Sequence, residues 1–292
     1  IKSEILGTSS NDLKEIRVLN RVVKCNDRGY TLEADPRHAE IAIRDLGLCD
    51  AKPSKLPGSK EEQKKSGGGP AGAGDYPLNL AEAGAETRNW EFPSGRGKGR
   101  GIVEEIMAVG DDKVEEEIDE TILGAVDAKL YRGVAARLNY MGPDRPDMQY
   151  AIKEAARAMS SPRQCDWAIL KKAVRYLLYR PRLVMRYGWQ SKQTCIDGYT
   201  DSDWAGCSKS RKSTSGAVIM LGKHLVKSYS RMQKVIAMSS AEAETYGMVS
   251  CSAEILGIQA CARDMGMYFE ATIYADASAA LGIVQRRGIG KV

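Results

Sequence analysis

The stretch IDGYTDSDW, residues 196–204, places Asp201 at the end of a short run that is rich in β-forming residues. Two other acids have comparable settings: Glu244 lies just inside the helix-like stretch SSAEAETY, and Asp276 follows a strand-like run in ATIYADASA. Carboxylates from strand ends and a helix start can converge on one point. Two Mg²⁺ ions about 3.5–4 Å apart need such oxygen ligands to hold one phosphate. The three acids therefore predict the metal site of a phosphodiester hydrolase.

Two further acids, Glu242 and Asp203, lie two residues from the proposed ligands and could be metal ligands themselves. Ser239 and Glu242 fit a capping box, in which the serine caps the helix and the glutamate reaches back to the cap. Residues two apart on a helix point about 200° apart, so Glu242 and Glu244 cannot face one site. In a strand, residues two apart share a face, and Asp203 could therefore assist Asp201, although it lies nearer the strand end. Asp203 stays open as an additional metal ligand.

Composition limits the function without deciding it. The chain has 292 residues, 43% of them hydrophobic, which suits about two globular domains. Its formal net charge of +5 is compatible with a polyanionic partner but does not require one. Among its 38 Asp and Glu residues, the three at strand and helix ends could also be ordinary surface acids.

Several classes of site are disfavoured. The seven cysteines form no CxxC pair and no zinc-ligand spacing, which indicates reduced cysteines in a cytosolic or nuclear protein. The two histidines, His38 and His224, lie near no nucleophile motif, so Ser-His and Cys-His catalysis is not expected. No apolar run approaches the roughly 18 residues of a membrane span, and no membrane partner is expected.

The first half of the chain contains a hairpin, a helix and a low-complexity segment. Residues 14–25 are strand-like, and the turn sequence NDRG precedes a second strand-like run. Asp35-Pro36 is a typical helix start, and Gly47 a typical helix stop. Gly, Pro, Ser and charged residues then dominate, so residues 57–122 are predicted to be a flexible linker.

The second half changes from helices to a mixed α/β pattern. Helical periodicity runs from Asp127 to about 142, again from Pro146, and again from Ser161-Pro162. Strands are expected over 194–200, 216–221, 225–230 and 272–275, with helices over 240–265 and 278–286. The predicted fold class is α/β, and the element order in this last part is β-β-β-α-β-α.

Four blocks carry a family resemblance. They are GYTDSDWAG (198–206), RKSTSGAVIMLG (211–222), MSSAEAETYG (238–247) and IYADASAALGI (273–283). Together they closely resemble the ribonuclease H region of copia-type LTR retrotransposon Pol polyproteins. Upstream, LYRGVAARLNYMGPDRPDMQYAI (130–152) resembles the segment that joins reverse transcriptase to ribonuclease H.

The resemblance divides the chain into four parts and makes it a C-terminal fragment of such a polyprotein. Residues 1–56 resemble the end of the reverse transcriptase domain, and 57–122 are the linker. Residues 123–190 resemble the helical connecting segment, and 191–292 a ribonuclease H-like domain with a mixed sheet.

The resemblance implies hydrolysis of the RNA strand of an RNA/DNA hybrid, with two Mg²⁺ or Mn²⁺ ions. It implies that Asp201, Glu244 and Asp276 are the catalytic metal ligands. It also implies nucleic-acid contacts in the following loop, by Lys209, Arg211, Lys212, Ser213 and Thr214, although a solvated hairpin approach is an equal alternative for this loop. The remainder of the polyprotein is the implied partner. The implied locations are cytoplasmic virus-like particles and the nucleus.

One departure limits the expected activity. The family pattern continues with another strand and a helix that bring a fourth acidic ligand, whereas the sequence stops at Lys291-Val292. We therefore expect an incomplete domain and a metal site that is short of one ligand. The alternative function is a catalytically inactive, truncated remnant that at most binds nucleic acid.

Overall fold

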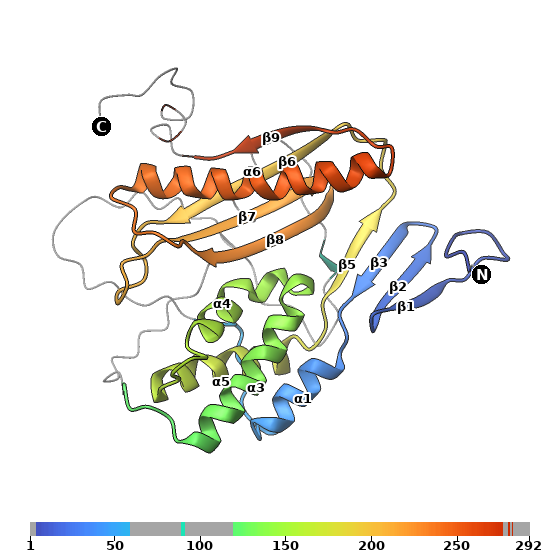
Figure 1. Ribbon diagram of the computed structural model, residues 1–292. Coiled ribbons are helices and arrows are strands. Elements are labelled where there is room, and N and C mark those ends of the chain that lie inside the picture. The colour runs from blue at the N-terminus through green and yellow to red at the C-terminus, as the bar shows by residue number, and fades with distance from the viewer. Residues whose placement is uncertain (1–3, 59–88, 91–118, 277–279, 281, 283–292) are drawn as a thin grey trace.

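The protein has a mixed α/β architecture with two sheets in the part of the chain that the structure describes (Figure 1). The computed structural model describes residues 4–58, 89–90, 119–276, 280 and 282. One sheet has the strand order β1-β2-β3-β5-β4, and the other has the order β8-β7-β6-β9. Helices α1, α3, α4 and α5 pack together beside the sheets, and α6 lies along one face of the second sheet (Figure 1).

The first sheet joins segments that are distant in the sequence. Its strands are β1 (Glu15–Val18), β2 (Arg21–Asn26), β3 (Gly29–Glu33), β4 (Asn89–Trp90) and β5 (Val184–Gly188). Strand β5 pairs antiparallel with β3, and the sequence did not predict it. The expected single strand over residues 14–25 is wrong, because Leu19 and Asn20 form a two-residue turn with φ of 50° and 64°. Two central residues with positive φ are the signature of a type I′ hairpin turn.

The helices form one apolar core. They are α1 (Arg37–Asp45), α3 (Ala125–Met141), α4 (Gln149–Arg157) and α5 (Gln164–Tyr179), with the short 3₁₀ helices η1 (Gly142–Asp144) and η2 (Pro146–Met148) between α3 and α4. Tyr131, Leu138, Leu170 and Leu177 are fully buried in this core, which confirms the helical periodicity. Helix α1 contributes Ala39 and Ala42 to it, so the N-terminal segment and the later helices share one core.

Helix α5 begins two residues later than predicted. Its N-cap is Arg163, and Asp166 accepts a hydrogen bond from the Arg163 backbone amide at 2.9 Å. The Arg163 guanidinium also binds the Asp166 carboxylate. The acid at the third helical position thus defines the start of α5, and Ser161-Pro162 precedes it.

The predicted acids lie in or beside the second sheet. Its strands are β6 (Cys195–Asp203), β7 (Thr214–Leu221), β8 (His224–Met232) and β9 (Glu270–Tyr274), and α6 (Ser240–Asp264) comes between β8 and β9. Strand β6 is antiparallel to β7 and parallel to β9. Ile196 and Ile219 pack against Cys251 and Ile255 of α6. The predicted order β-β-β-α-β is confirmed.

Some predicted elements fall outside the described residues. Ala280 and Gly282 are helical, and the rest of the predicted helix over 278–286 lies outside. Most of the predicted linker over 57–122 lies outside as well. Among the helices that the structure describes, none combines the length and the apolar character needed to cross a membrane.

Helix α4 connects the helical core to the second sheet. Lys153 Nζ donates a hydrogen bond to Thr214 Oγ1 at 3.0 Å, and Arg157 Nη1 lies 2.9 Å from Cys207 Sγ. Both partners belong to the segment that follows Asp201 along the chain. The helical core therefore supports the edge of the sheet where the predicted site lies.

Candidate metal centre

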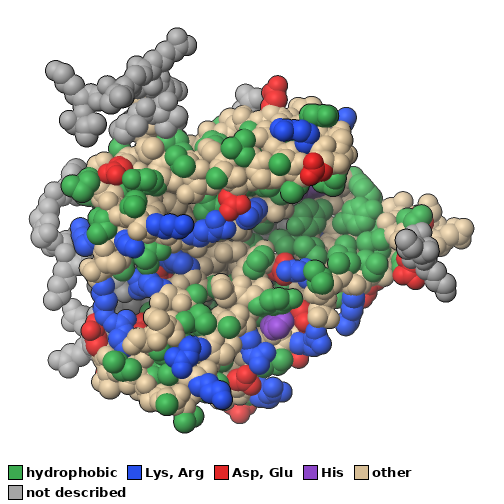
Figure 2. Space-filling view, viewed as in Figure 1, with side chains coloured by type: hydrophobic (Ala, Val, Ile, Leu, Met, Phe, Trp, Pro, Cys, Tyr) green, Lys and Arg blue, Asp and Glu red, His purple; other side chains and the backbone are tan. Residues whose placement is uncertain are grey.

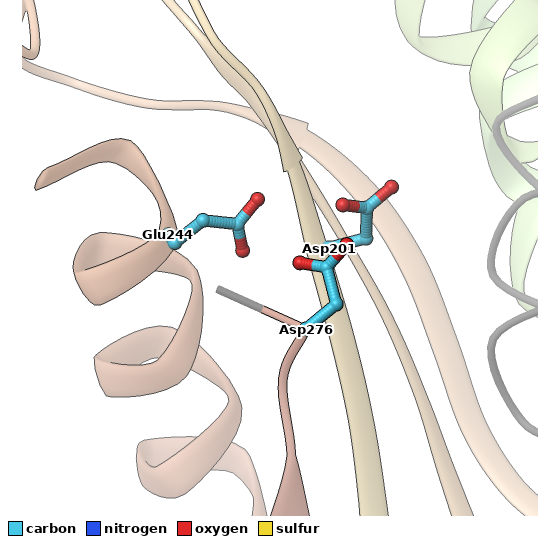
Figure 3. Close-up of side chains that lie close together, drawn as sticks. All are labelled: Asp201, Glu244 and Asp276. Atoms are coloured by element: carbon cyan, nitrogen blue, oxygen red, sulfur yellow. The ribbon is translucent and has the colours of Figure 1, made fainter. Parts of the chain in front are cut away.

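Three acids from three separate elements come together at one edge of the second sheet. Asp201 lies near the end of β6, Asp276 lies just beyond β9, and Glu244 lies in the second turn of α6 (Figure 3). Strands β6 and β9 are parallel neighbours, so their carboxyl ends meet at the same edge. One carboxylate oxygen from each residue lies within 4.8 Å of the others. The structure thus brings together the trio that the sequence singled out.

Glu244 is the most constrained member of the cluster. Its side chain is buried, with 6% of its surface exposed. Glu244 Oε1 accepts a hydrogen bond from the Ser202 backbone amide at 3.0 Å, and the same amide donates to Asp201 Oδ1 at 3.0 Å. Glu244 Oε2 is buried and has no hydrogen-bond donor among the described residues. One amide therefore orients two carboxylates, and one buried oxygen is left unsatisfied.

The electrostatics of the cluster favour a bound cation. Burial, and next the Asp201 carboxylate, raise the pKa of Glu244 to about 7 from its ordinary value of 4.5, with a smaller contribution from Asp276. A cation beside these groups would stabilise their charged forms, because an opposite charge within about 4–6 Å favours ionisation. Carboxylate oxygens are the ligands that hard divalent cations prefer. The unsatisfied Oε2 of Glu244 and the oxygen-only donor set therefore fit a metal ion held by Asp201, Glu244 and Asp276.

The two neighbouring acids have other contacts. Ser239 Oγ accepts a hydrogen bond from the Glu242 amide at 3.2 Å, as the capping box predicts. Glu242 Oε2 accepts from the Met238 amide at 2.7 Å, one residue before the expected position. The Asp203 carboxylate lies against Gly206, so close that a Cβ there would come within 1.8 Å of Asp203 Oδ2. Asp203 is not among the carboxylates that form the cluster.

The predicted basic residues lie in the loop between β6 and β7. Arg211 is exposed and has φ of 54°, and Lys212 is half-buried. Lys209 is about half exposed and forms an ion pair with Glu120. Figure 2 shows several Lys and Arg side chains on one face of the molecule, with Asp and Glu among them. On β8, Lys227 and Arg231 both pair with Glu254 of α6. Several of these basic side chains are therefore paired with acids, and Arg211 stays exposed in the loop.

Two predicted nucleic-acid contacts are not accessible in this structure. Ser213 is 0% exposed, and its hydroxyl accepts a hydrogen bond from the Ala205 amide at 3.0 Å. Thr214 is 3% exposed, and its hydroxyl accepts from Lys153. Both hydroxyls serve internal contacts, because β7 starts beneath the loop. The expectation that they touch nucleic acid is therefore corrected.

Sequence reasoning missed the polar side chains behind the carboxylates. Ser202 belongs to β6, Ser215 to β7, and Gln233 follows β8. Their side chains contact one another, and Gln233 also contacts α6. No local sequence pattern marks Gln233, which lies just beyond β8 and is buried. Contacts between residues that are distant in the sequence carry no local pattern.

Curated proteins of related sequence include retrovirus-related Pol polyproteins of plant transposons. The chain is 31% identical over 154 residues to the "Retrovirus-related Pol polyprotein from transposon RE2" of Arabidopsis thaliana. It is also 31% identical over 143 residues to the corresponding polyprotein from transposon RE1 of the same plant. These alignments cover 51% and 48% of the chain but 10% of each polyprotein. The chain therefore spans about a tenth of the length of these relatives.

A shorter relative is matched over most of its length. The chain is 32% identical over 124 residues to "Secreted RxLR effector protein 161" of Plasmopara viticola, and the alignment covers 41% of the chain and 84% of that protein. No protein-family model matches the chain. No solved structure matches it either.

Proposed function

Because the chain belongs to the family of the retrovirus-related Pol polyproteins of copia-type transposons, we propose that it carries a metal-dependent ribonuclease H activity. The proposed reaction is hydrolysis of the RNA strand of an RNA/DNA hybrid. The proposed cofactor is a pair of Mg²⁺ or Mn²⁺ ions, and the proposed partner is the remainder of a Pol polyprotein. The proposed fold of the second sheet with α6 is ribonuclease H-like. Action in cytoplasmic particles and in the nucleus is part of the same proposal.

The observation that carries this proposal is the convergence of Asp201, Glu244 and Asp276 within 4.8 Å, with Glu244 buried and one of its oxygens unsatisfied. Bound divalent cations would polarise the scissile phosphate and offset the negative charge that develops on it. The three carboxylates would hold the ions at the edge of the sheet. The Ser202 amide keeps Asp201 and Glu244 oriented toward each other before substrate arrives.

The loop between β6 and β7 supports binding of a nucleic-acid backbone. Lys209, Arg211 and Lys212 lie in the loop that joins β6, which carries Asp201, to β7, and we propose that they contact phosphates of a strand that enters the site. Contacts of this kind position a duplex and carry no sequence information. Ser213 and Thr214 fix the base of the loop from inside, and they take no part in the proposed contact.

Cleavage of a labelled RNA/DNA hybrid by the full chain in Mg²⁺ tests the proposal. Asp201→Asn and Glu244→Gln each remove one charge with little change of shape, and we expect both to abolish cleavage. Asp264→Asn is the matched control, because it removes an exposed carboxylate from the opposite end of the same helix.

Three experimental results would each contradict part of the proposed function. Cleavage that survives Asp201→Asn and Glu244→Gln would show that the site is wrongly assigned. A chain that binds the hybrid but does not cleave it would support the alternative of a nucleic-acid-binding remnant. A chain that cleaves double-stranded RNA or DNA as well as the hybrid would overturn the substrate assignment.

A further inference from the structure

A line of hydrogen bonds runs behind the carboxylate cluster, from β8 to α6. Gln233 Nε2 donates to Ser215 Oγ at 2.8 Å and to the Ala243 carbonyl oxygen at 2.8 Å. Ser215 Oγ lies 3.0 Å from Ser202 Oγ. The Ser202 amide then donates to Asp201 and Glu244. The line thus ends on two members of the cluster.

The residues of this line are buried or half-buried, so its hydrogen bonds help to fix the relative positions of β6, β7 and α6. Gln233 and Ser215 are both buried, and Ser202 is half-buried. Breaking one link leaves a buried donor or acceptor without water to replace its partner, which is unfavourable. The line therefore resists any displacement of β6, β7 or α6 that would lengthen its bonds.

The hydrogen bond from Gln233 to the Ala243 carbonyl oxygen fixes the backbone next to Glu244. Ala243 immediately precedes Glu244 and lies in the first turn of α6, where a backbone carbonyl can accept a bond from outside the helix as well as one from within it. The Gln233 amide thus fixes the helix one residue from the buried carboxylate. Through Ser215 and Ser202 it also fixes the end of β6, one residue from Asp201.

We propose that Gln233 and Ser215 are positioning residues that hold the start of α6 and the end of β6 in register, so that Glu244 and Asp201 converge on a divalent cation. This inference rests on the proposed function. Neither residue touches the ion or the phosphate. Both act through the Ser202 amide and the Ala243 carbonyl.

The test replaces the bridging hydroxyl and measures ion binding directly. Ser215→Ala removes the acceptor of Gln233 and the partner of Ser202, whereas Ser215→Thr keeps a hydroxyl at the same position. Ser230→Ala is the matched control: Ser230 is equally buried on the neighbouring strand, and its hydroxyl has no hydrogen-bond partner in the described part of the chain. Binding of Mn²⁺ to each folded full-length variant is measured by calorimetry, with hybrid cleavage as the second readout.

We expect Ser215→Ala to weaken Mn²⁺ binding about 10-fold, as is common for groups that orient metal ligands. Ser215→Thr should restore binding to within about twofold, and Ser230→Ala should leave it unchanged. Among variants that cleave, kcat should fall with KM for the hybrid unchanged. Gln233→Glu, which keeps the shape but loses both donated bonds, should weaken Mn²⁺ binding to a similar degree.

Equal Mn²⁺ affinity in the wild-type chain and Ser215→Ala would overturn the inference, as would an equal loss in Ser230→Ala. If the wild-type chain binds Mn²⁺ without cleaving hybrids, the proposed function fails, and the ratio of affinities still decides the positioning role. If the wild-type chain binds no Mn²⁺, both proposals are wrong.

Discussion

Gly247 in α6 lies so close to Ser202 in β6 that a Cβ atom on the glycine would come within 2.6 Å of the serine hydroxyl oxygen. The same Cβ would lie 3.0 Å from Thr200 Oγ1. The missing side chain lets the helix approach the sheet, and Glu244, one turn earlier on the helix, reaches Ser202 and Asp201 as a result.

Gly247→Ala should therefore weaken the site. Alanine is ordinarily preferred to glycine in a helix by about 0.5–1 kcal/mol, but here the contact with Ser202 opposes that gain. We expect a lower melting temperature and weaker Mn²⁺ binding. Gly257→Ala is the control, because its Cβ would meet no atom within 4 Å, and this variant should be stabilised. Equal behaviour of the two variants would contradict the close-approach argument.

The stability of the metal-free chain should depend on pH through Glu244. A carboxyl with a higher pKa in the folded chain binds its proton more tightly when folded, so the free energy of unfolding falls as pH rises between the two pKa values. With a rise from 4.5 to about 7, the expected loss across that interval is at most about 3 kcal/mol. Denaturant titrations at several pH values measure it.

Glu244→Gln provides the matched comparison, since it removes the titration and keeps the shape. Its stability should lack this decrease between pH 4.5 and 7, so the variant should exceed the wild-type chain in stability at pH 8 without metal. If the stability of the wild-type chain instead rises with pH through the same interval, the pKa of Glu244 is not raised in the folded chain.

Divalent cations should stabilise the folded chain. Ligand binding to the folded state alone adds about 2.7 kcal/mol at a free concentration 100 times Kd. Addition of Mg²⁺ or Mn²⁺ should therefore raise the melting temperature, and a chelator should reverse the increase. Asp276→Asn should lose this effect, whereas Asp264→Asn, which changes an exposed acid at the end of α6, should keep it.

Arg211→Gln should reduce the salt dependence of nucleic-acid binding. Each phosphate contact contributes a slope of about 0.9 in a plot of log affinity against log salt concentration, so the loss of one contact should reduce the slope by about that amount. Lys129→Gln on α3 is an exposed control with the same change in net charge. Identical slopes for the two variants would remove Arg211 from the proposed contact surface.

Arg145→Met should strongly destabilise the helical core. Arg145 is 1% exposed, and its guanidinium donates to Asp147 and to the Arg180 carbonyl. Loss of one partner from a buried ion pair costs about 3–5 kcal/mol, because the other charge stays buried. Chemical denaturation should show this cost, while Arg132→Met at an exposed position of α3 should change stability by less than about 0.5 kcal/mol.

The sequence predicted those elements whose pattern is local. The periodicity of Tyr131, Val134 and Leu138 predicted α3, and the capping box of Ser239 and Glu242 predicted the start of α6. Strand ends and a helix start pointed to the three acids, the family resemblance distinguished them from ordinary surface acids, and the structure brings them together. In these cases interactions between residues only a few positions apart determine the local structure.

Features that depend on distant partners were missed. Leu19 gave no turn signal, because leucine rarely adopts a positive φ, and the run around it looked like one strand. Nucleic-acid contacts were expected for Ser213 and Thr214, because nothing in the neighbouring sequence shows that Ala205 and Lys153 bind their hydroxyls from inside. Strand β5 became recognisable only through its pairing with β3.

The pairing of β3 with β5 also affects folding during synthesis, because β3 is made long before β5. Glu33 pairs with Val184, which follows it by 151 positions, and Ala42 of α1 is buried against helices from the same later part of the chain. At about 5–20 residues per second, a ribosome takes roughly 8–30 s to make the intervening stretch. Helix α3, the earliest of these helical partners, begins about 80 positions after the end of α1, and until it is made the described partners of the apolar face of α1 are absent. Chaperone binding during synthesis should therefore fall mainly on the first fifty residues.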